Sequence, residues 1–238
     1  MPPNEASDET QWSLVLRTRS DDSTIAQTAL SHLCNRYWFP VYAYILKVGN
    51  SPERARDLTQ DFFLRIVEGR VLDEADPDRG KFRSLLFSSV RNFLTDAWRH
   101  DQAERRGGGV ANLSLDFEHA DNLYASAIRE EDTPDKAFDR QWARTVMAHA
   151  FVRLQSDYAK QGKENVFLAL QGLLTEKSGS VDYELVAKTL DTSQNAARTA
   201  AHRLRKRYAN ALRAEVSETV AESEHVGDEM NYLLDALR

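Results

Sequence analysis

The feature that most constrains the fold is a helical spacing of apolar residues that returns in one segment after another. Residues 134–161 show it in the clearest form, with a row at intervals of four residues made of Phe138, Trp142, Val146, Ala150 and Leu154. No segment shows the strict alternation of a strand, and the 238 residues include only 10 glycines and 6 prolines. This pattern favours long helices. The sequence therefore predicts an all-α protein.

The first half is expected to contain three helices. The first starts at Asp21, Asp22 or Ser23, is interrupted at Pro40 and ends at Gly49. The second has Ser51 as N-cap and Pro52 as its first residue and closes at Gly69. The third covers residues 82–106 with a stripe made of Leu86, Val90, Phe93 and Ala97.

Two adjacent aromatic residues in the second helix pose a question about its faces. Phe62 and Phe63 cannot both point into one narrow apolar stripe. Either the helix buries a wide face, or Phe63 lies at the border of a second face that meets a partner. Around these residues lies a polar set made of Asp57, Gln60, Asp61 and Arg65. These polar residues could form a surface that binds a partner, or they could simply face the solvent. The helical spacing does not decide between the two.

The chain is expected to form two small helical domains joined by a linker. The expected parts are a flexible N-terminus (1–19), a helical domain (20–106), a linker (107–134), a second helical domain (135–213) and an acidic extension (214–238). The polar, acidic composition of residues 110–133 and the triple glycine at 107–109 mark the linker. The extension is expected to be an amphipathic helix with an apolar side made of Val226, Met230, Leu233, Leu234 and Leu237.

The distribution of charge is more informative than the net charge of -6. Residues 193–213 contain six basic residues and no acidic one, whereas residues 214–238 contain seven acidic residues and one basic. A strongly positive helix is thus followed directly by an acidic segment. We therefore expect the extension to act as a packing or regulatory helix that could shield the basic helix from non-specific DNA.

Residues 181–208 have the pattern of a helix-turn-helix. Leu185, Val186 and Leu190 form an apolar face, Ala187 permits a close helix crossing, and residues 191–193 form a turn in which Thr192 or Ser193 caps the second helix. The residues expected to meet bases or phosphates are Gln194, Asn195, Arg198, Thr199, His202, Arg203, Arg205, Lys206 and Arg207. The alternative is a solvated basic helix, but the combination with a capped turn favours DNA binding. Four positions of this helix are alanines, which offer no polar group for contacts to bases: Ala196, Ala197, Ala200 and Ala201.

Several other classes of protein fit the sequence poorly. No apolar run approaches the length of a membrane span, and the N-terminus is unlike a secretory signal. The single cysteine, Cys34, excludes an internal disulfide, which fits a reducing cytoplasm. We expect Cys34 to pack in the core rather than to act as a nucleophile. Asp57 and Asp61 lie one helical turn apart and could pair as metal ligands or as acid and base. No further ligand joins them at suitable spacing and no phosphate loop is present, so we expect no enzyme, no metal and no cofactor.

Two stretches resemble the second conserved region of bacterial sigma-70 family factors, in particular the small extracytoplasmic-function type. In the first stretch, residues 51–66, the residues that match the family pattern are Asp57, Leu58, Gln60, Asp61 and Phe63. In the second stretch, residues 82–99, the matching residues are Phe82, Leu86, Arg91, Asn92, Asp96 and Arg99. The helix-turn-helix resembles the fourth region of the same family. The resemblance covers about residues 20–105 and 137–212, and both regions occur in the order of the family with a linker between them.

The resemblance implies an RNA polymerase sigma factor that directs core polymerase to promoters and assists strand opening. Core polymerase would be bound through the clamp helices of its largest subunit by Asp57, Gln60, Asp61 and Arg65. The minus-10 element would be recognised and melted by loop 69–82 and the next helix, through Phe82, Arg83, Arg91, Asn92, Thr95 and Arg99. The helix-turn-helix would bind the minus-35 element and touch the polymerase flap. An anti-sigma factor is a further partner that the family allows.

Alternatives remain beside this interpretation. A helix-turn-helix regulator that binds DNA without polymerase needs only the second domain. Asn92 and Asp96 could form an intrahelical pair, and Trp98 is expected to pack in the core.

Overall fold

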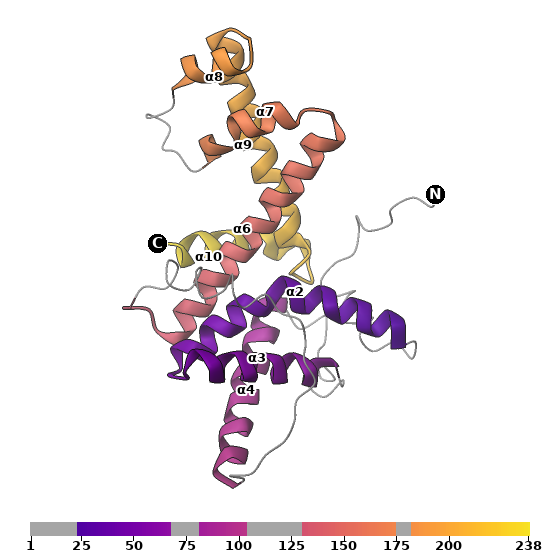
Figure 1. Cartoon of the computed structure of the whole chain (residues 1–238), viewed down its shortest axis with the longest axis vertical. Helices are drawn as coiled ribbons and strands as arrows, with labels where there is room; N and C mark the ends of the chain where they lie inside the picture. Colours follow the sequence, from indigo (N-terminus) through magenta and orange to yellow (C-terminus); the bar gives the residue numbers. More distant parts are fainter. Residues whose placement is uncertain (1–22, 68–80, 104–129, 175–181) are drawn as a thin grey trace. The chain divides into compact units, whose positions relative to one another are not determined.

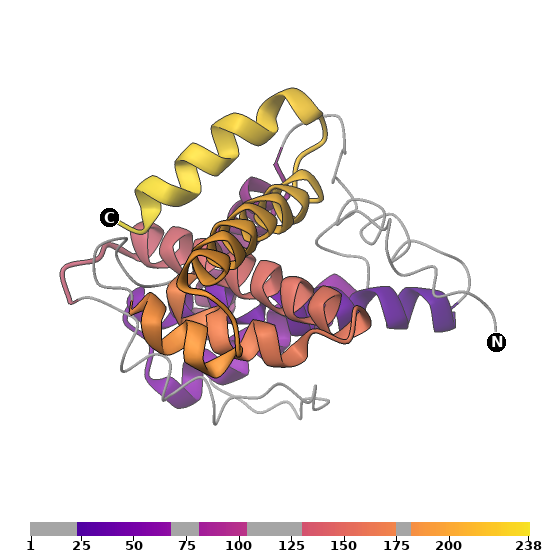
Figure 2. The ribbon, with the colours of Figure 1, turned by 90° about the horizontal axis from the view of Figure 1, so that it is seen from above.

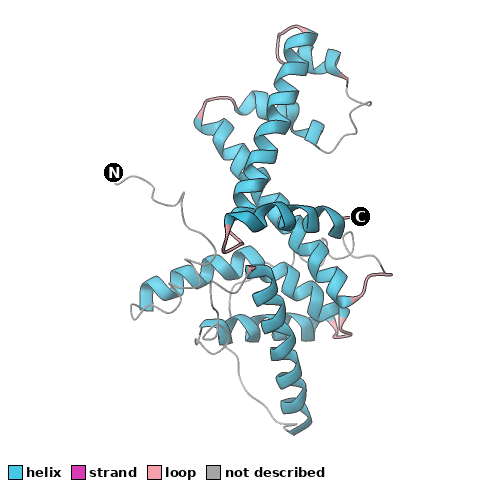
Figure 3. Cartoon of the chain, turned by 180° about the vertical axis from the view of Figure 1, so that it is seen from behind, coloured by secondary structure: helices cyan, strands magenta, loops and turns pink. Residues whose placement is uncertain are grey.

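The computed structural model describes residues 23–67, 81–103, 130–174 and 182–238. These parts of the chain are helical and contain no strand beyond one isolated bridge, so the predicted all-α class is confirmed (Figures 1 and 3). The elements in chain order are α2 (Ser23–Lys47), α3 (Pro52–Val67), α4 (Phe82–Ala103), α6 (Pro134–Lys160), α7 (Glu164–Leu170), the 3-10 helix η2 (Gln171–Leu174), α8 (Tyr183–Thr189), α9 (Gln194–Ser217), the 3-10 helix η3 (Ser223–His225) and α10 (Val226–Ala236).

The chain divides into two compact units whose boundaries differ from the expected domains. Unit 1 comprises residues 1–145 together with 216–238, and unit 2 comprises residues 146–215. The first part of α6 therefore belongs to unit 1, although it was expected to open the second domain. The C-terminal segment also belongs to unit 1. Unit 2 is consequently joined to unit 1 at both of its ends, within α6 and within α9.

The first helix of unit 1 continues through Pro40, where an interruption was expected. Its central part is buried almost all round, with Val41, Tyr42 and Ile45 fully inaccessible to solvent. Tertiary packing of this kind can outweigh the loss of one helical hydrogen bond at a proline. The predicted end at Gly49 is confirmed, because Gly49 has the left-handed φ of 105° and its N–H donates to the carbonyl of Leu46 (3.0 Å).

Both adjacent phenylalanines of α3 lie in the core. Phe62 and Phe63 are at most 1% exposed, and their rings meet edge to face with centroids 5.2 Å apart. Phe62 also contacts Phe93 of α4 at 5.5 Å between centroids. The helix therefore buries a wide face, and Phe63 is not a border residue. The predicted N-cap is confirmed, since the N–H of Arg54 donates to Oγ of Ser51 (3.3 Å).

The core of unit 1 joins segments from the whole length of the chain. Tyr37 of α2 stacks on Trp142 of α6 with ring centroids 4.7 Å apart, and it contacts Phe82 of α4 at 5.2 Å. The C-terminal segment adds Val216 and Leu233, both at most 3% exposed. In Figure 2, α10 is a separate helix that follows the loop after α9. Its predicted apolar side is correct at Val226 and Leu233, whereas Leu234 is 47% exposed.

Unit 2 has its own small core. The second half of α6, α7, η2, α8 and α9 contribute the buried residues Leu154, Tyr158, Phe167, Leu170, Leu173, Val186, Ala187, Ala197, Ala201 and Leu204. The row predicted along α6 is buried over its whole length, from Phe138 to Leu154. Two of the alanines that made α9 look bare, Ala197 and Ala201, are fully buried, because small side chains let α9 approach the rest of the core closely.

Candidate functional site

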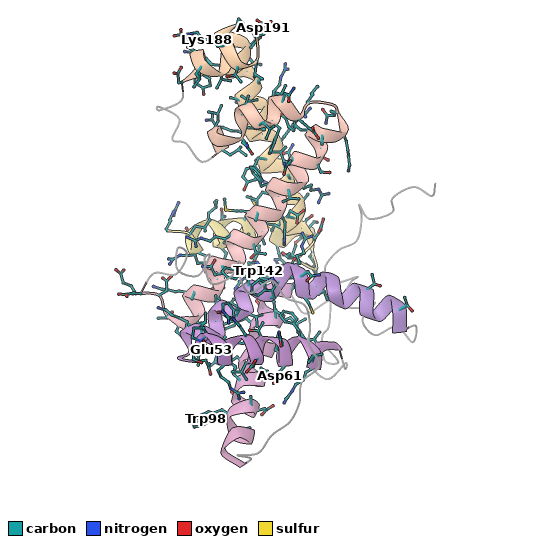
Figure 4. All side chains as sticks on the ribbon, viewed as in Figure 1. Glu53, Asp61, Trp98, Trp142, Lys188 and Asp191 are labelled. Atoms are coloured by element: carbon teal, nitrogen blue, oxygen red, sulfur yellow. The ribbon has the colours of Figure 1, made fainter. Side chains whose placement is uncertain are left out.

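The outer face of α3 carries a row of acidic side chains opposite the buried phenylalanines. Asp57 is exposed, and Gln60, Asp61 and Arg65 are half-buried. The exposed Glu53 lies four residues before Asp57 and so extends the row by one turn, which the sequence motif did not include. In Figure 4, Glu53 and Asp61 mark the two ends of this row along α3. The face is suited to a basic partner surface.

Arg65 lies at the edge of this face rather than at its centre. Its guanidinium carbon is 5.0 Å from the centre of the Phe93 ring, a cation–π distance. The side chain therefore packs on α4 while it stays half-buried. Arg65 therefore links α3 to α4 at the edge of the acidic row.

A pocket of about 660 Å³ lies where the end of α2, the start of α3 and the middle of α4 meet. Its lining consists of Tyr44, Val48, Gly49, Asn50, Arg54, Leu58, Arg91, Leu94, Thr95, Ala97 and Trp98. Arg91 and Thr95, two of the residues predicted to hold DNA, come together here. The pocket combines cationic, aromatic and hydrogen-bonding groups, the set that proteins use to bind unpaired nucleotides.

Trp98 is the residue of this pocket whose burial the sequence analysis predicted wrongly. It was expected in the core, yet it is 67% exposed at the rim of the pocket (Figure 4). The helical spacing explains the error, because Trp98 follows the buried Phe93 by five residues and so falls off the apolar stripe. An exposed tryptophan in a pocket that also contains Arg91 has the chemistry to stack on an unpaired base.

Two further predicted residues of α4, Asn92 and Arg99, are exposed but do not line the pocket. Arg99 lies 3.5 Å from Asp96 in an exposed ion pair one turn apart. Asp96 thus forms an ion pair with Arg99, whereas Asn92 was considered for this role. Such a pair contributes little to stability, so Arg99 stays available to a ligand.

Phe82 and Arg83 do not face solvent, which corrects their placement in an open DNA pocket. Phe82 is 2% exposed in the core, and Arg83 is 9% exposed. The guanidinium of Arg83 donates to Glu229 (2.9 Å) and to Asp139 (2.8 Å). Burial alone would lower the pKa of Arg83, but these carboxylates hold it above its ordinary value. In this conformation Arg83 is an internal ion-pair residue. The preceding part of the expected pocket, residues 69–80, lies outside the described residues.

The turn of the predicted helix-turn-helix has the expected boundaries. Asp182 caps α8 by accepting from the N–H groups of Glu184 (3.0 Å) and Leu185 (3.1 Å). Ser193 rather than Thr192 caps α9, since its Oγ accepts from the N–H of Ala196 (3.2 Å). Asp191 has a left-handed φ of 47°, a conformation that aspartate tolerates better than most residues.

The residues of α9 predicted to contact DNA fall into two groups. Those that are exposed are Gln194, Asn195, Arg198, Thr199, His202, Arg203, Lys206 and Arg207. Arg205 is half-buried and donates to the carbonyl of Leu173 in η2 (3.1 Å). Arg205 therefore holds unit 2 together in this conformation, and its place in the phosphate-binding stripe is not supported by its contacts.

Two of the exposed arginines are oriented by aromatic neighbours. The guanidinium of Arg198 lies 5.4 Å from the centre of the Tyr183 ring at the start of α8. Arg207 lies 5.0 Å from the ring of Tyr158 and donates to Gln161 (3.2 Å). These contacts limit the rotamers of both side chains. The other two exposed arginine or lysine residues predicted to contact DNA are Arg203 and Lys206.

Neither a metal centre nor a reactive thiol emerges from the parts of the chain that the structure describes. No group of three potential ligands among histidine, cysteine, aspartate and glutamate is found there. Cys34 is 1% exposed, and burial raises the pKa of its thiol to about 12. None of the described helices is both long and apolar enough to cross a membrane.

Comparison with known proteins gives one match. Residues 33–104 match the family described as Sigma-70 region 2, a segment that covers α2 from Leu33, α3 and α4. No curated protein and no solved structure matches the chain. The match includes both the acidic face of α3 and the pocket beside α4. Residues 33–104 of the chain are thus similar to sigma-70 region 2.

Proposed function

We propose that the protein is a sigma factor of the extracytoplasmic-function type, which acts in the cytoplasm as a promoter-specificity subunit without catalysis of its own. The match of residues 33–104 carries this proposal. The helix-turn-helix of unit 2 supports it, because a sigma factor of this type needs a second DNA-binding part after region 2. The order of the two parts along the chain agrees with the order in the family.

In this proposal the acidic face of α3 binds core RNA polymerase. Glu53, Asp57 and Asp61 recur every four residues and so form one row along the helix. Acidic side chains in a row favour a basic partner surface, for which we propose the clamp helices of the largest polymerase subunit. Gln60 and Arg65 flank the row and add hydrogen-bonding capacity.

The pocket beside α4 binds the opened minus-10 strand in this proposal. Trp98 offers a stacking surface, while Arg54 and Arg91 supply positive charge for the strand backbone. Thr95 donates its hydroxyl to the carbonyl of Arg91 (3.0 Å), so its oxygen can still accept from a base. Asn92 and Arg99, exposed on the same helix, extend the contact beyond the pocket.

The second unit binds the minus-35 element through the N-terminal turns of α9. Gln194, Asn195 and Arg198 are exposed at that end, where a recognition helix meets base edges. Arg203, Lys206 and Arg207 lie further along and are placed for phosphates. The polymerase flap and an anti-sigma factor are further partners in this proposal.

Binding to core polymerase tests the proposal. Wild-type chain should bind purified core RNA polymerase, and Asp61→Lys should weaken that binding at least tenfold, because it reverses a charge within the acidic row. Asp157→Lys is the matched control, since Asp157 is an exposed aspartate on α6 in unit 2. Equal binding of both variants would remove α3 from the interface, and absence of wild-type binding would overturn the sigma assignment.

A DNA-binding regulator that acts without polymerase is the second candidate. It is favoured by one observation, namely that unit 2 has its own buried core and a fully capped helix-turn-helix. This candidate predicts sequence-specific binding of duplex DNA by the chain alone and no binding to core polymerase. The polymerase experiment therefore separates the two.

A further inference from the structure

The last 23 residues are an integral part of unit 1. We name residues 216–238 the C-terminal clasp. Val216, Val220, Val226 and Leu233 of the clasp are at most 6% exposed. The segment lies outside the region 2 match, which ends at residue 104. It is therefore an addition that this chain packs onto the matched segment.

The clasp contacts the start of α4 through the backbone. The N–H of Phe82 donates to the carbonyl of Thr219 (2.9 Å), and Lys81 forms an antiparallel bridge with Val220. The first N–H groups of a helix have no partner within the helix. Thr219 supplies one, so the first turn of α4 depends on the clasp for a backbone hydrogen bond.

A buried cluster of ion pairs also connects the clasp to the start of α4. Glu229 of α10 is 0% exposed, with its two carboxylate oxygens 2.9 Å from Nε of Arg83 and 2.8 Å from Nζ of Lys81. Arg83 also forms an ion pair with Asp139 of α6, in which Nη1 lies 2.8 Å from Oδ1. The guanidinium carbon of Arg83 lies 3.9 Å from the centre of the Tyr232 ring. Lys81, just before α4, and Arg83, in its first turn, thus share one carboxylate of the clasp.

The other end of α10 is held by α6. The Nε–H of Arg140 donates to the carbonyl of Ala236 (3.2 Å), and the hydroxyl of Tyr232 donates to Asp139. Near the other end of the clasp, Glu218 lies 3.7 Å from Arg36 of α2. The clasp therefore reaches α2, α4 and α6, and its contacts converge on residues 81–83.

We propose that the clasp is a positioning device for the DNA-binding surface of unit 1, with Glu229 as its central positioning residue. This inference rests on the proposed function. Residues 81–83 include the first residues of the helix that carries Arg91, Thr95 and Trp98, so a fixed first turn fixes the direction in which the pocket residues point. Because a buried carboxylate without partners is costly, Glu229 favours the arrangement in which Arg83 and Lys81 both meet it.

The opposite role, a clasp that blocks DNA, is the alternative that an experiment must separate. A blocking clasp would sequester cations that DNA needs, and its release would raise promoter binding. The contacts favour positioning instead, because Phe82 beside Arg83 is a core residue packed on Tyr37 and Trp142. Release of the clasp would leave that residue in the core, so it would not create a complete DNA surface.

Glu229→Gln in the full-length chain tests the inference, because it removes the charge and keeps the shape. Glu224→Gln is the matched control, since Glu224 is an exposed glutamate in the same clasp. Tyr232→Phe is a milder second variant that keeps the ring over Arg83 and loses the hydroxyl bonded to Asp139. Hydrogen exchange of the Phe82 amide reports the clasp directly, without any DNA or polymerase.

The expected result is amide exchange at Phe82 about tenfold faster or more in Glu229→Gln, and unchanged in Glu224→Gln. Binding to core polymerase should stay within about twofold, while open-complex formation at a promoter mapped by run-off transcription should fall by about tenfold. A general loss of folding would instead lower polymerase binding and open-complex formation together. Increased open-complex formation would show a blocking clasp and overturn the proposal, as would unchanged exchange at Phe82.

Failure of the proposed function has a different signature. In that case wild-type chain does not bind core polymerase, although the exchange at Phe82 still responds to Glu229→Gln. Unchanged open-complex formation in a Glu229→Gln variant that binds polymerase would leave the sigma assignment intact and refute the positioning role.

Discussion

Two adjacent cations of α9 should behave differently when each is replaced by alanine. Arg205 is half-buried and donates to the carbonyl of Leu173 (3.1 Å), whereas Lys206 is exposed. A hydrogen bond from a charged donor contributes about 1.5–3 kcal/mol, and the partial exposure of Arg205 places its bond at the lower limit. Arg205→Ala should therefore lower the free energy of unfolding by about 1.5 kcal/mol. Lys206→Ala should change it by less than about 0.5 kcal/mol, as usual for a surface position.

The DNA-binding effects should show the reverse order. Each phosphate contact contributes about 0.9 to the slope of log K against log salt concentration for duplex DNA. Lys206→Ala should reduce that slope by about one, and Arg205→Ala should leave it unchanged. Urea unfolding followed by circular dichroism gives the stability, and fluorescence anisotropy with a labelled duplex from low to moderate salt gives the slope. The duplex needs no promoter sequence, because this electrostatic part of binding does not depend on sequence.

The opposite behaviour of Arg205→Ala would refute a structural role for Arg205. If Arg205→Ala reduced the salt slope by about one without loss of stability, Arg205 would be a phosphate contact and its bond to Leu173 would contribute nothing. Lys160→Ala provides a control for the loss of a positive charge, because Lys160 is exposed at the end of α6, outside α9.

Three further predictions concern caps, core and thiol. Ser193→Ala should lower the free energy of unfolding by about 1 kcal/mol through loss of the α9 cap, measured by urea unfolding, with the exposed Ser156→Ala as control; equal stability of the two variants would contradict the cap. Phe63→Ala should cost about 3–5 kcal/mol because Phe63 is 1% exposed, and a loss below about 1 kcal/mol in thermal or urea unfolding would place it at the surface. Cys34 should not react with a thiol reagent at pH 8 in the folded chain, since burial raises its thiol pKa to about 12, and should react after unfolding; rapid reaction of folded chain would contradict its burial.

Local patterns in the sequence were sufficient for the helices and for the helix-turn-helix. The row from Phe138 to Leu154 and the caps at Ser51 and Ser193 depend on spacing within a few residues, and all of them are found in the structure. The family resemblance pointed to Arg91 and Thr95, which both line the pocket, although it could not show that α2 and α3 complete the pocket. What lies within one helix was therefore predictable.

Contacts between distant segments were not predictable in this way. Glu229 and Arg83 are 146 residues apart, and both are charged, so a pattern of apolar residues gives no sign that they meet in the core. The same limit explains why the acidic extension was expected to cover the basic helix. Net charge suggested that pairing, whereas Glu229 pairs with Arg83 and Lys81 of unit 1. Pro40 was misjudged for a similar reason, since burial of the surrounding helix is a tertiary effect.

The measurement that tests the central claim most directly is run-off transcription with purified core RNA polymerase, followed by mapping of the 5′ ends of the transcripts. The account predicts transcripts that appear only when the chain is added and whose start sites share two upstream sequence elements. Mutation of Trp98 to alanine should reduce these transcripts while polymerase binding persists, because Trp98 lies on the exposed rim of the α4 pocket rather than on α3. If the chain adds no start sites to those of core polymerase alone, it is not a sigma factor.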